Sequence, residues 1–127
     1  MKLEDLEVYN ISMDLSDKIW VIVDKWDFFR KDTVGKQLVR AIDSVSANIS
    51  EGFGRNTFKD QRSFYYYSRG SLYESKTWIT KAKRREIIDE ITYDELLTEF
   101  NILGVKLNNF IASVTKLMNS NNIDEAK

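Results

Sequence analysis

The chain has 127 residues, of which 43% are hydrophobic, 13% aromatic and 31% charged. Its 19 Lys and Arg against 20 Asp and Glu give a net charge of -1 at pH 7, so no overall field marks a nucleic-acid or membrane binder. The sequence contains no His and no Cys, which excludes Ser-His and Cys-His catalysis, zinc-finger sites and disulfides. The absence of Pro, together with only five Gly, indicates long uninterrupted helices.

The first residues are acidic and contain no apolar core of signal-peptide length. No apolar run approaches the ~20 residues that are needed to cross a bilayer. We therefore expect a cytoplasmic protein that does not enter a membrane.

The first predicted helix runs from about Asp5 to Phe29, because apolar residues recur along it at spacings of three and four. A second apolar row lies beside the first and widens the apolar arc to roughly 220°. Either neighbouring helices enclose this helix on both sides, or part of the arc is a subunit interface. The small size of the chain favours the interface. Its candidate residues are Tyr9, Met13 and Trp20.

The second predicted helix covers residues 36–53. Residues 30–36 are polar and contain Gly35, so we expect a connection there. Gly52 and Gly54 are expected to end the second helix in a left-handed conformation.

The third predicted helix runs from Phe58 to about Arg85, with Thr57 as its N-cap. Gly70 lies beside an inward row that contains three serines, so we expect another backbone to come close. The predicted inward row consists of Phe64, Tyr67, Ser68, Ser71, Leu72, Ser75, Trp78, Ile79 and Ala82.

The fourth predicted helix opens with a capping box over residues 92–95 and then repeats apolar residues at an average spacing of 3.5. That period predicts left-handed, near-antiparallel packing. We therefore expect an all-α fold, an antiparallel up-down-up-down four-helix bundle, with one domain over residues 1–118 and a polar, frayed tail over 119–127. The repeating row is Leu96, Phe100, Leu103, Leu107, Phe110, Val114 and Leu117.

No residue pattern indicates catalysis or a cofactor. Di-iron bundles use Glu-x-x-His pairs, and the sequence has no His to form them. The segment around Gly52 lacks the Gly-Lys-Ser/Thr ending of a phosphate-binding loop. We expect no catalytic, cofactor-binding or metal site and no small-molecule substrate.

A polar stripe follows the second helix and its exit. Two interpretations are open: a solvated face, or a polar ladder that faces another helix or subunit. Ser and Asn have low helix propensity, so a face that only meets solvent does not explain them in the middle of a helix. We therefore favour the ladder, which would be a structural hydrogen-bond network and not a ligand site. The stripe consists of Arg40, Ser44, Asn48, Glu51 and Arg55.

Basic and aromatic side chains share the outer face of the third helix, and no acid lies between Asp60 and Glu74. Basic residues with interleaved tyrosines can hold phosphates and stack on unpaired bases. Alternatively, the cations complement the helix dipole and the tyrosines serve a protein interface. The candidate face for a nucleic acid or another partner consists of Lys59, Arg62, Tyr66, Arg69, Tyr73 and Arg84.

Several motifs occur together in order. The segment from Ser44 to Gly52 (SVSANISEG), then Arg55, then the segment from Gly70 to Glu74 (GSLYE) resembles the four-helix-bundle family encoded in intervening sequences of bacterial 23S ribosomal RNA genes. The likeness covers about residues 5 to 118. The matching polar cluster is Arg40, Ser44, Asn48, Glu51, Gly52, Arg55, Gly70, Ser71 and Glu74.

The resemblance implies a homopentamer without known enzymatic activity, an assembly that would use the surplus apolar surface. Members have been named ribosomal or rRNA-associated proteins from their gene position, and a related group serves as accessory subunits of reverse transcriptases in diversity-generating retroelements. Those accessory proteins are basic and bind nucleic acid, whereas this chain has a net charge of -1. We therefore expect a non-enzymatic oligomeric adaptor for RNA or for a nucleic-acid enzyme, with a protein-only scaffold as the alternative.

Overall fold

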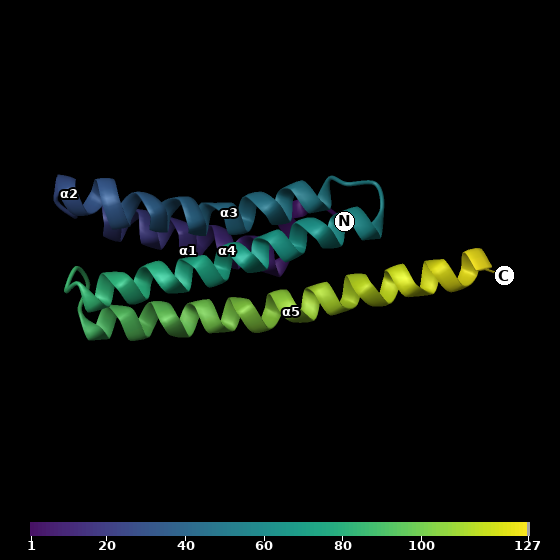
Figure 1. Cartoon of the computed structure of the whole chain (residues 1–127). Helices are drawn as coiled ribbons and strands as arrows, with labels where there is room; N and C mark the ends of the chain where they lie inside the picture. The colour runs from purple at the N-terminus through teal and green to yellow at the C-terminus, as the bar shows by residue number, and fades with distance from the viewer. Residues whose placement is uncertain (127) are drawn as a thin grey trace.

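A computed structural model describes the backbone of residues 1–126 and the side chains of residues 1–120. Within this described part, the chain forms four long helices and three short helical segments (Figure 1). The long helices are α1 (Glu7–Asp24), α3 (Lys36–Phe53), α4 (Phe58–Arg84) and α5 (Glu90–Ala126). The short segments are a 3-10 turn (Leu3–Asp5), α2 (Phe28–Arg30) and a π-helical turn (Lys31–Gly35).

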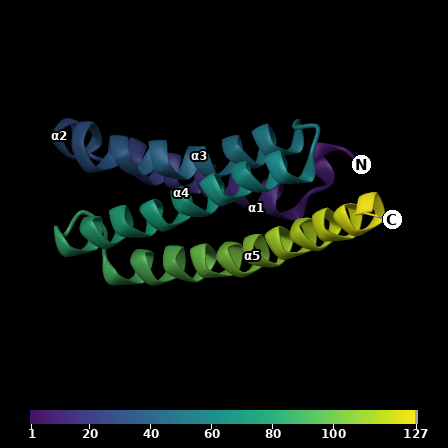
Figure 2. The same cartoon turned by 45° about the vertical axis from the view of Figure 1, so that its right-hand side comes forward.

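The four long helices alternate in direction along one common axis, as Figures 1 and 2 show. α3 packs against both α1 and α4, α4 also packs against α5, and a sparser contact between α5 and α1 closes the bundle. The predicted all-α, antiparallel up-down-up-down four-helix bundle is therefore confirmed. The predicted tail over residues 119–127 falls partly outside the described side chains, so its boundary stays a prediction.

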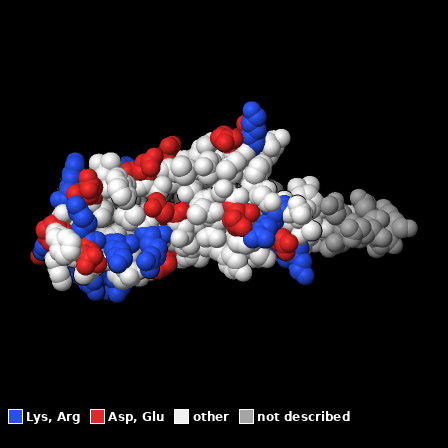
Figure 3. All heavy atoms as spheres, turned by 90° about the horizontal axis from the view of Figure 1, so that it is seen from above, with Lys and Arg blue, Asp and Glu red and all other residues white. Residues whose placement is uncertain are grey.

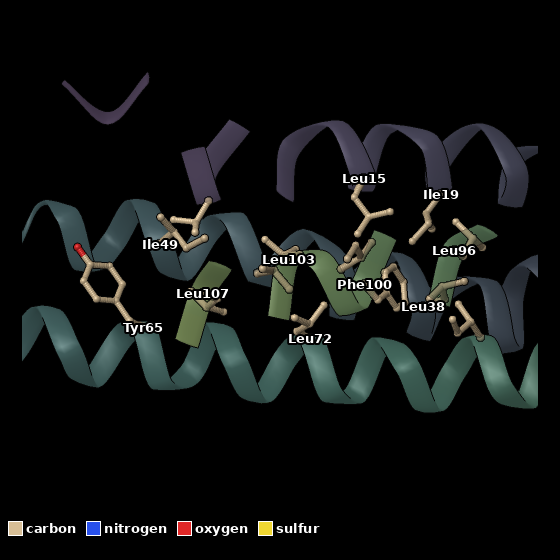
Figure 4. Packing of buried hydrophobic residues seen from close by; sticks show 14 of the residues in the cluster. Leu15, Ile19, Leu38, Ile49, Tyr65, Leu72, Leu96, Phe100, Leu103 and Leu107 are labelled. Atoms are coloured by element: carbon tan, nitrogen blue, oxygen red, sulfur yellow. The ribbon is translucent and has the colours of Figure 1, made fainter. Parts of the chain in front are cut away.

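The core runs the length of the bundle and takes side chains from all four long helices (Figure 4). The predicted period of α5 is confirmed at Leu96, Phe100, Leu103 and Leu107, which are all fully or almost fully buried. Leu117 continues the same row but is 51% exposed, whereas Val114, one turn earlier, is buried.

The first helix ends earlier than predicted, at Asp24, and the polar segment 30–36 is helical rather than a connection. The Asp27 carboxylate accepts a hydrogen bond from the Arg30 backbone N–H at 3.0 Å, which caps a new helix start. Gly35 permits close packing rather than a turn, since a Cβ at this position would lie 2.7 Å from Cγ1 of Val23.

The prediction that Gly52 and Gly54 turn left-handed is wrong, since no glycine in the described chain has a positive φ. Gly52 is buried within α3, where a Cβ would lie 2.7 Å from Cε1 of Tyr65. This glycine therefore lets α4 approach α3. The left-handed residue is Glu86, with φ 58°, directly after the C-cap of α4.

The N-cap of α4 is confirmed, because the Thr57 hydroxyl accepts a hydrogen bond from the Asp60 backbone N–H at 3.1 Å. The capping box predicted at residues 92–95 is wrong. α5 begins at Glu90, and the Asp89 carboxylate accepts from the Thr92 backbone N–H at 2.7 Å. Asp and Thr are both good caps, and the earlier one starts the helix.

The inward face of α4 differs from the prediction in its first two turns. Tyr65 is buried and Tyr67 is 59% exposed. A run of four consecutive aromatic residues hides the phase of the helix, and Tyr65, Leu72 and Ile79 form the observed repeat of seven. Ser68, one turn further along, is buried and donates a hydrogen bond to the Val45 carbonyl of α3 at 2.7 Å.

Candidate nucleic-acid interface and assembly surfaces

Two arginines on α4 flank the same tyrosine ring. The Cζ atom of Arg62 lies 5.5 Å from the centroid of the Tyr66 ring, and that of Arg69 lies 4.9 Å from it. These spacings follow from the helix, since residues three and four apart share one face. The guanidinium groups are thereby held along one flank of the bundle.

The same two arginines reach across to α5. Nη1 of Arg62 donates to Oγ1 of Thr115 at 3.3 Å, and Nη1 of Arg69 donates to Oδ1 of Asn108 at 3.3 Å. These partners are neutral, so they orient the guanidinium groups without cancelling their charge. Each guanidinium keeps further N–H donors for an anionic partner.

One turn further along α4, Nζ of Lys76 lies 5.3 Å from the centroid of the Tyr73 ring, which is 61% exposed. We call Arg62, Tyr66, Arg69, Tyr73 and Lys76 the Arg–Tyr row. Among the described side chains, none of its three cations forms an ion pair with a carboxylate. The row is therefore a local stripe of unneutralised positive charge on a chain with a net charge of -1.

The other two residues of the predicted face stand apart from the Arg–Tyr row. Lys59 is exposed in the first turn of α4. Arg84 is the last residue of α4, roughly 22 Å from Arg69 along a helix that rises about 1.5 Å per residue. Sequence reasoning left Lys76 out of the face, although its i,i+3 spacing from Tyr73 was a usable signal.

The polar stripe on α3 is satisfied within its own helix. The Ser44 hydroxyl donates to the Arg40 carbonyl at 2.8 Å, and the Asn48 amide donates to the Ser44 carbonyl at 2.8 Å. Ser44 and Asn48 do not bridge to another helix of the described chain, so that form of the ladder is wrong, whereas a ladder to another subunit stays a prediction. Ser and Asn side chains can form such hydrogen bonds to the backbone of their own helix, so they need no partner on a second element.

The end of the stripe supports the turn between α3 and α4. Nη2 of Arg55 lies 2.6 Å from Oε1 of Glu51, and Cζ of Arg55 lies 4.5 Å from the centroid of the Phe64 ring. Together with the close approach of α4 at Gly52, these contacts indicate a structural role for this part of the cluster.

Gly70 lies in the middle of α4, and no atom outside its immediate surroundings lies within 4 Å of the place of a Cβ. The expected close backbone is therefore absent from the described chain. The neighbouring cluster residues make local contacts: the Ser71 carbonyl accepts from the Ser75 hydroxyl at 2.8 Å, and Oε1 of Glu74 accepts from Nε1 of Trp78 at 3.4 Å.

The residues predicted for a subunit interface lie along one side of α1. Tyr9 is half-buried and packs against the core, Met13 is exposed, and Trp20 is 59% exposed. Sequence reasoning did not place Phe28 and Phe29 among the interface residues, although they are 79% and 72% exposed. The prediction of a single helix through Phe29 did not foresee that α1 ends at Asp24 and that both rings lie on α2.

Figure 3 views the bundle over α3 and shows Lys and Arg side chains gathered, together with Asp and Glu, at the end that carries α2. Among the described side chains, no group of three or more His, Cys, Asp or Glu residues is arranged to hold a metal ion. In the described part of the chain, every helix is too short or too polar to span a bilayer.

Comparison with known proteins connects this fold to one family. The family model for the 23S rRNA-intervening sequence protein matches residues 4–109. A crystal structure of a protein with unknown function from the S23 ribosomal protein family of Bacteroides thetaiotaomicron is similar, with a TM-score of 0.75 and 19% identity. The similarity covers 83% of this chain and 95% of that one, and at this identity it shows the fold alone. No curated protein matches the chain.

Proposed function

We propose that this chain, which belongs to the 23S rRNA-intervening sequence protein family, is a non-enzymatic, homo-oligomeric adaptor that binds RNA through the Arg–Tyr row. The single observation that carries the proposal is the row itself: three cations without carboxylate partners and two exposed tyrosine rings on one flank of α4. The site would lie in the cytoplasm of a bacterial cell, where ribosomal RNA is available.

The chemistry of the row matches RNA in two ways. Guanidinium and ammonium groups release counterions from the phosphate backbone, which supplies sequence-independent affinity. Tyrosine rings stack on bases, and this contact needs bases that are unpaired. Tyr73 offers the more exposed ring, whereas Tyr66 is flanked by two guanidinium groups. The row therefore favours structured RNA with single-stranded loops over continuous duplex.

The test is RNA binding by the double variant Arg62→Glu/Arg69→Glu, measured over a range of salt concentrations with a hairpin RNA that carries an unpaired loop. Loss of two phosphate contacts should lower the slope of log K against log [salt] by about 1.4 to 1.8. Both side chains are partly exposed, so the variant should fold. The matched control is Lys2→Glu/Lys25→Glu, which changes the net charge by the same amount at exposed sites away from the row.

The outcomes are distinct. Weakened binding with a reduced salt slope in the row variant, but not in the control, supports the proposal. Equal losses in both variants indicate a general charge effect and contradict it. Negligible affinity of the wild-type protein for the hairpin at low salt also rules out direct RNA binding.

The oligomeric part of the proposal is supported by the exposed apolar side chains on α1. Met13 and Trp20 lie outside the core of the isolated chain, and burying such side chains against another copy is favourable. Sedimentation of the wild-type protein at micromolar concentration tests this part. An assembly supports it, and a monomer across the whole range contradicts it.

The second candidate function is a protein-only scaffold, and Gly70 is the observation that favours it. Gly70 leaves an open place on α4 between Tyr67 and Tyr73, two exposed aromatic side chains of a type enriched at protein interfaces. A purified complex that persists at high salt after nuclease treatment, and that Gly70→Gln abolishes, would favour this function over RNA binding.

A further inference from the structure

A hollow with apolar walls opens at the end of the bundle that carries α2. It has a volume of about 340 Å³, and Trp20, Val23 and Val39 line it. We call it the Trp20 pocket. Its rim is charged and consists of Lys31, Lys36 and Arg40 together with Asp24, whose Oδ1 lies 3.6 Å from Nζ of Lys31.

The pocket exists because of how α1 meets the start of α3. The π-helical turn (Lys31–Gly35) widens the backbone just before α3, and such turns are frequent at functional sites. Gly35 allows this turn to approach Val23, where a Cβ would lie 2.7 Å away. As a result, the Trp20 side chain lies beside the hollow and does not pack into the core.

Phe28 and Phe29 are two strongly exposed apolar side chains at the same end of the bundle. They are 79% and 72% exposed, and neither belongs to the hydrophobic core. The cap that Asp27 forms with the Arg30 backbone N–H fixes the short helix α2 that carries them. Their exposure therefore follows from an ordered local structure.

We infer that the Phe28–Phe29 pair of one copy docks on the Trp20 pocket of the next copy and places one of its two rings inside. A hollow of about 340 Å³ is large enough for a phenylalanine side chain, and its apolar walls match one. The cations at the rim, Lys36 and Arg40, suit an aromatic ring, which attracts cations to its face. The inference rests on the homo-oligomer of the proposed function and names the contact that holds it together.

A second copy is the occupant that the chain itself supplies. The phenylalanine pair and the pocket are different surfaces of one molecule, so their contact is heterologous and passes from copy to copy. Because both surfaces lie at the end that carries α2, neighbouring bundles would lie side by side with that end in common (Figure 1). This arrangement suits a closed ring better than a head-to-tail filament.

The experiment compares two variants and their mixture by sedimentation and native mass measurement. Phe28→Ser/Phe29→Ser removes the insert and keeps the pocket, whereas Trp20→Ser opens the pocket and keeps the insert. All three side chains are exposed, so both variants should fold, and circular dichroism checks this. Val21→Ser and Ile91→Ser are the controls, since both remove exposed apolar side chains outside the pocket and the insert.

Each variant alone should need a higher protein concentration to assemble than the wild type. The increase should be roughly ten- to hundredfold for each large side chain that is lost. The controls should assemble like the wild type. The mixture should form a 1:1 heterodimer and nothing larger, because it contains one intact insert facing one intact pocket.

Three outcomes would overturn the inference. If the wild type assembles and Phe28→Ser/Phe29→Ser assembles equally well, the contact is wrong while the homo-oligomer stands. If both variants fall apart and their mixture forms no heterodimer, the two surfaces do not meet each other. A wild type that is monomeric at all concentrations refutes the oligomeric part of the proposed function together with this inference.

Discussion

Replacing Gly70 by alanine should stabilise the protein. Gly70 lies in the interior of the 27-residue helix α4, where glycine costs about 1 kcal/mol relative to alanine. Apart from its chain neighbours and the backbone of its own helix, no atom lies within 4 Å of the place of the new Cβ, so the helix-forming gain is not offset by a clash. We expect the free energy of unfolding to rise by about 0.5 to 1 kcal/mol. With an unfolding entropy of about 2.1 cal/mol/K per residue over 127 residues, 1 kcal/mol corresponds to about 4 °C in Tm.

The same substitution at Gly52 is the matched comparison, because Gly52 also lies within a helix but is buried. Its new Cβ would lie 2.7 Å from Cε1 of Tyr65 and 2.9 Å from the carbonyl oxygen of Gln61. A backbone oxygen cannot move away without displacing α4, so the overlap outweighs the gain in helix propensity. We expect a net loss of about 1 to 3 kcal/mol.

The assay is urea and thermal unfolding of both variants at one fixed protein concentration, because oligomerisation makes Tm depend on concentration. A Gly70→Ala variant that unfolds earlier than wild type would refute the view that this position is open. In that case another copy of the chain packs on the glycine. A Gly52→Ala variant that is more stable than wild type would refute the close approach of α4 to α3.

Three further predictions concern two ionisable groups and one core residue. Burial raises the pKa of Tyr65 to about 12. The free energy of unfolding should therefore fall as pH rises from about 10 to 12, by up to about 1.4 kcal/mol per pH unit. Tyr65→Phe should remove that slope when unfolding is measured across this range. Burial, and then the nearby charge of Asp17, raises the pKa of Asp43. Asp43→Asn should therefore stabilise the protein at pH 7, and the difference should vanish as pH falls below about 4, where the carboxyl group is protonated in both states. Phe100→Ala should cost about 3 to 5 kcal/mol because Phe100 is fully buried, whereas Ile102→Ala, two residues away and exposed, should cost far less in the same unfolding assay.

The fold could be predicted because the long helices carry periodic apolar rows without prolines. The row through Leu96, Phe100, Leu103 and Leu107 fixed both the buried face and the antiparallel packing. Helix ends were harder, since several residue types cap equally well: Asp27 and Asp89 both start helices that were placed elsewhere.

Glycine was the residue that sequence reasoning interpreted least well. Gly35 and Gly52 were assigned to turns, and both serve close packing inside helices. Gly70 was assigned to close packing, and it faces open space. A glycine signals a need for room or for conformational freedom, and only the positions of neighbouring elements decide between them.

The candidate site could be predicted in part for a similar reason. Helical spacing alone brings Arg62, Tyr66 and Arg69 together, so that part of the row was visible in the sequence. The phenylalanine pair and the Trp20 pocket were not, because they depend on where α1 ends and on a π-helical turn that leaves no mark in the apolar period.

Assembly and RNA binding should reinforce each other, which gives a final prediction. With a net charge of -1, one chain offers a single short basic row, and charges beyond about 8 Å are screened at physiological salt. The proposed ring would repeat the row once per copy. A long RNA that engages two rows would then bind the second intramolecularly, with a gain of 10²- to 10⁴-fold where the geometry permits both. Phe28→Ser/Phe29→Ser leaves the Arg–Tyr row intact and should therefore weaken binding of a long RNA with several loops far more than binding of a single short hairpin. Equal losses for the two RNAs would show that assembly does not act through repeated rows.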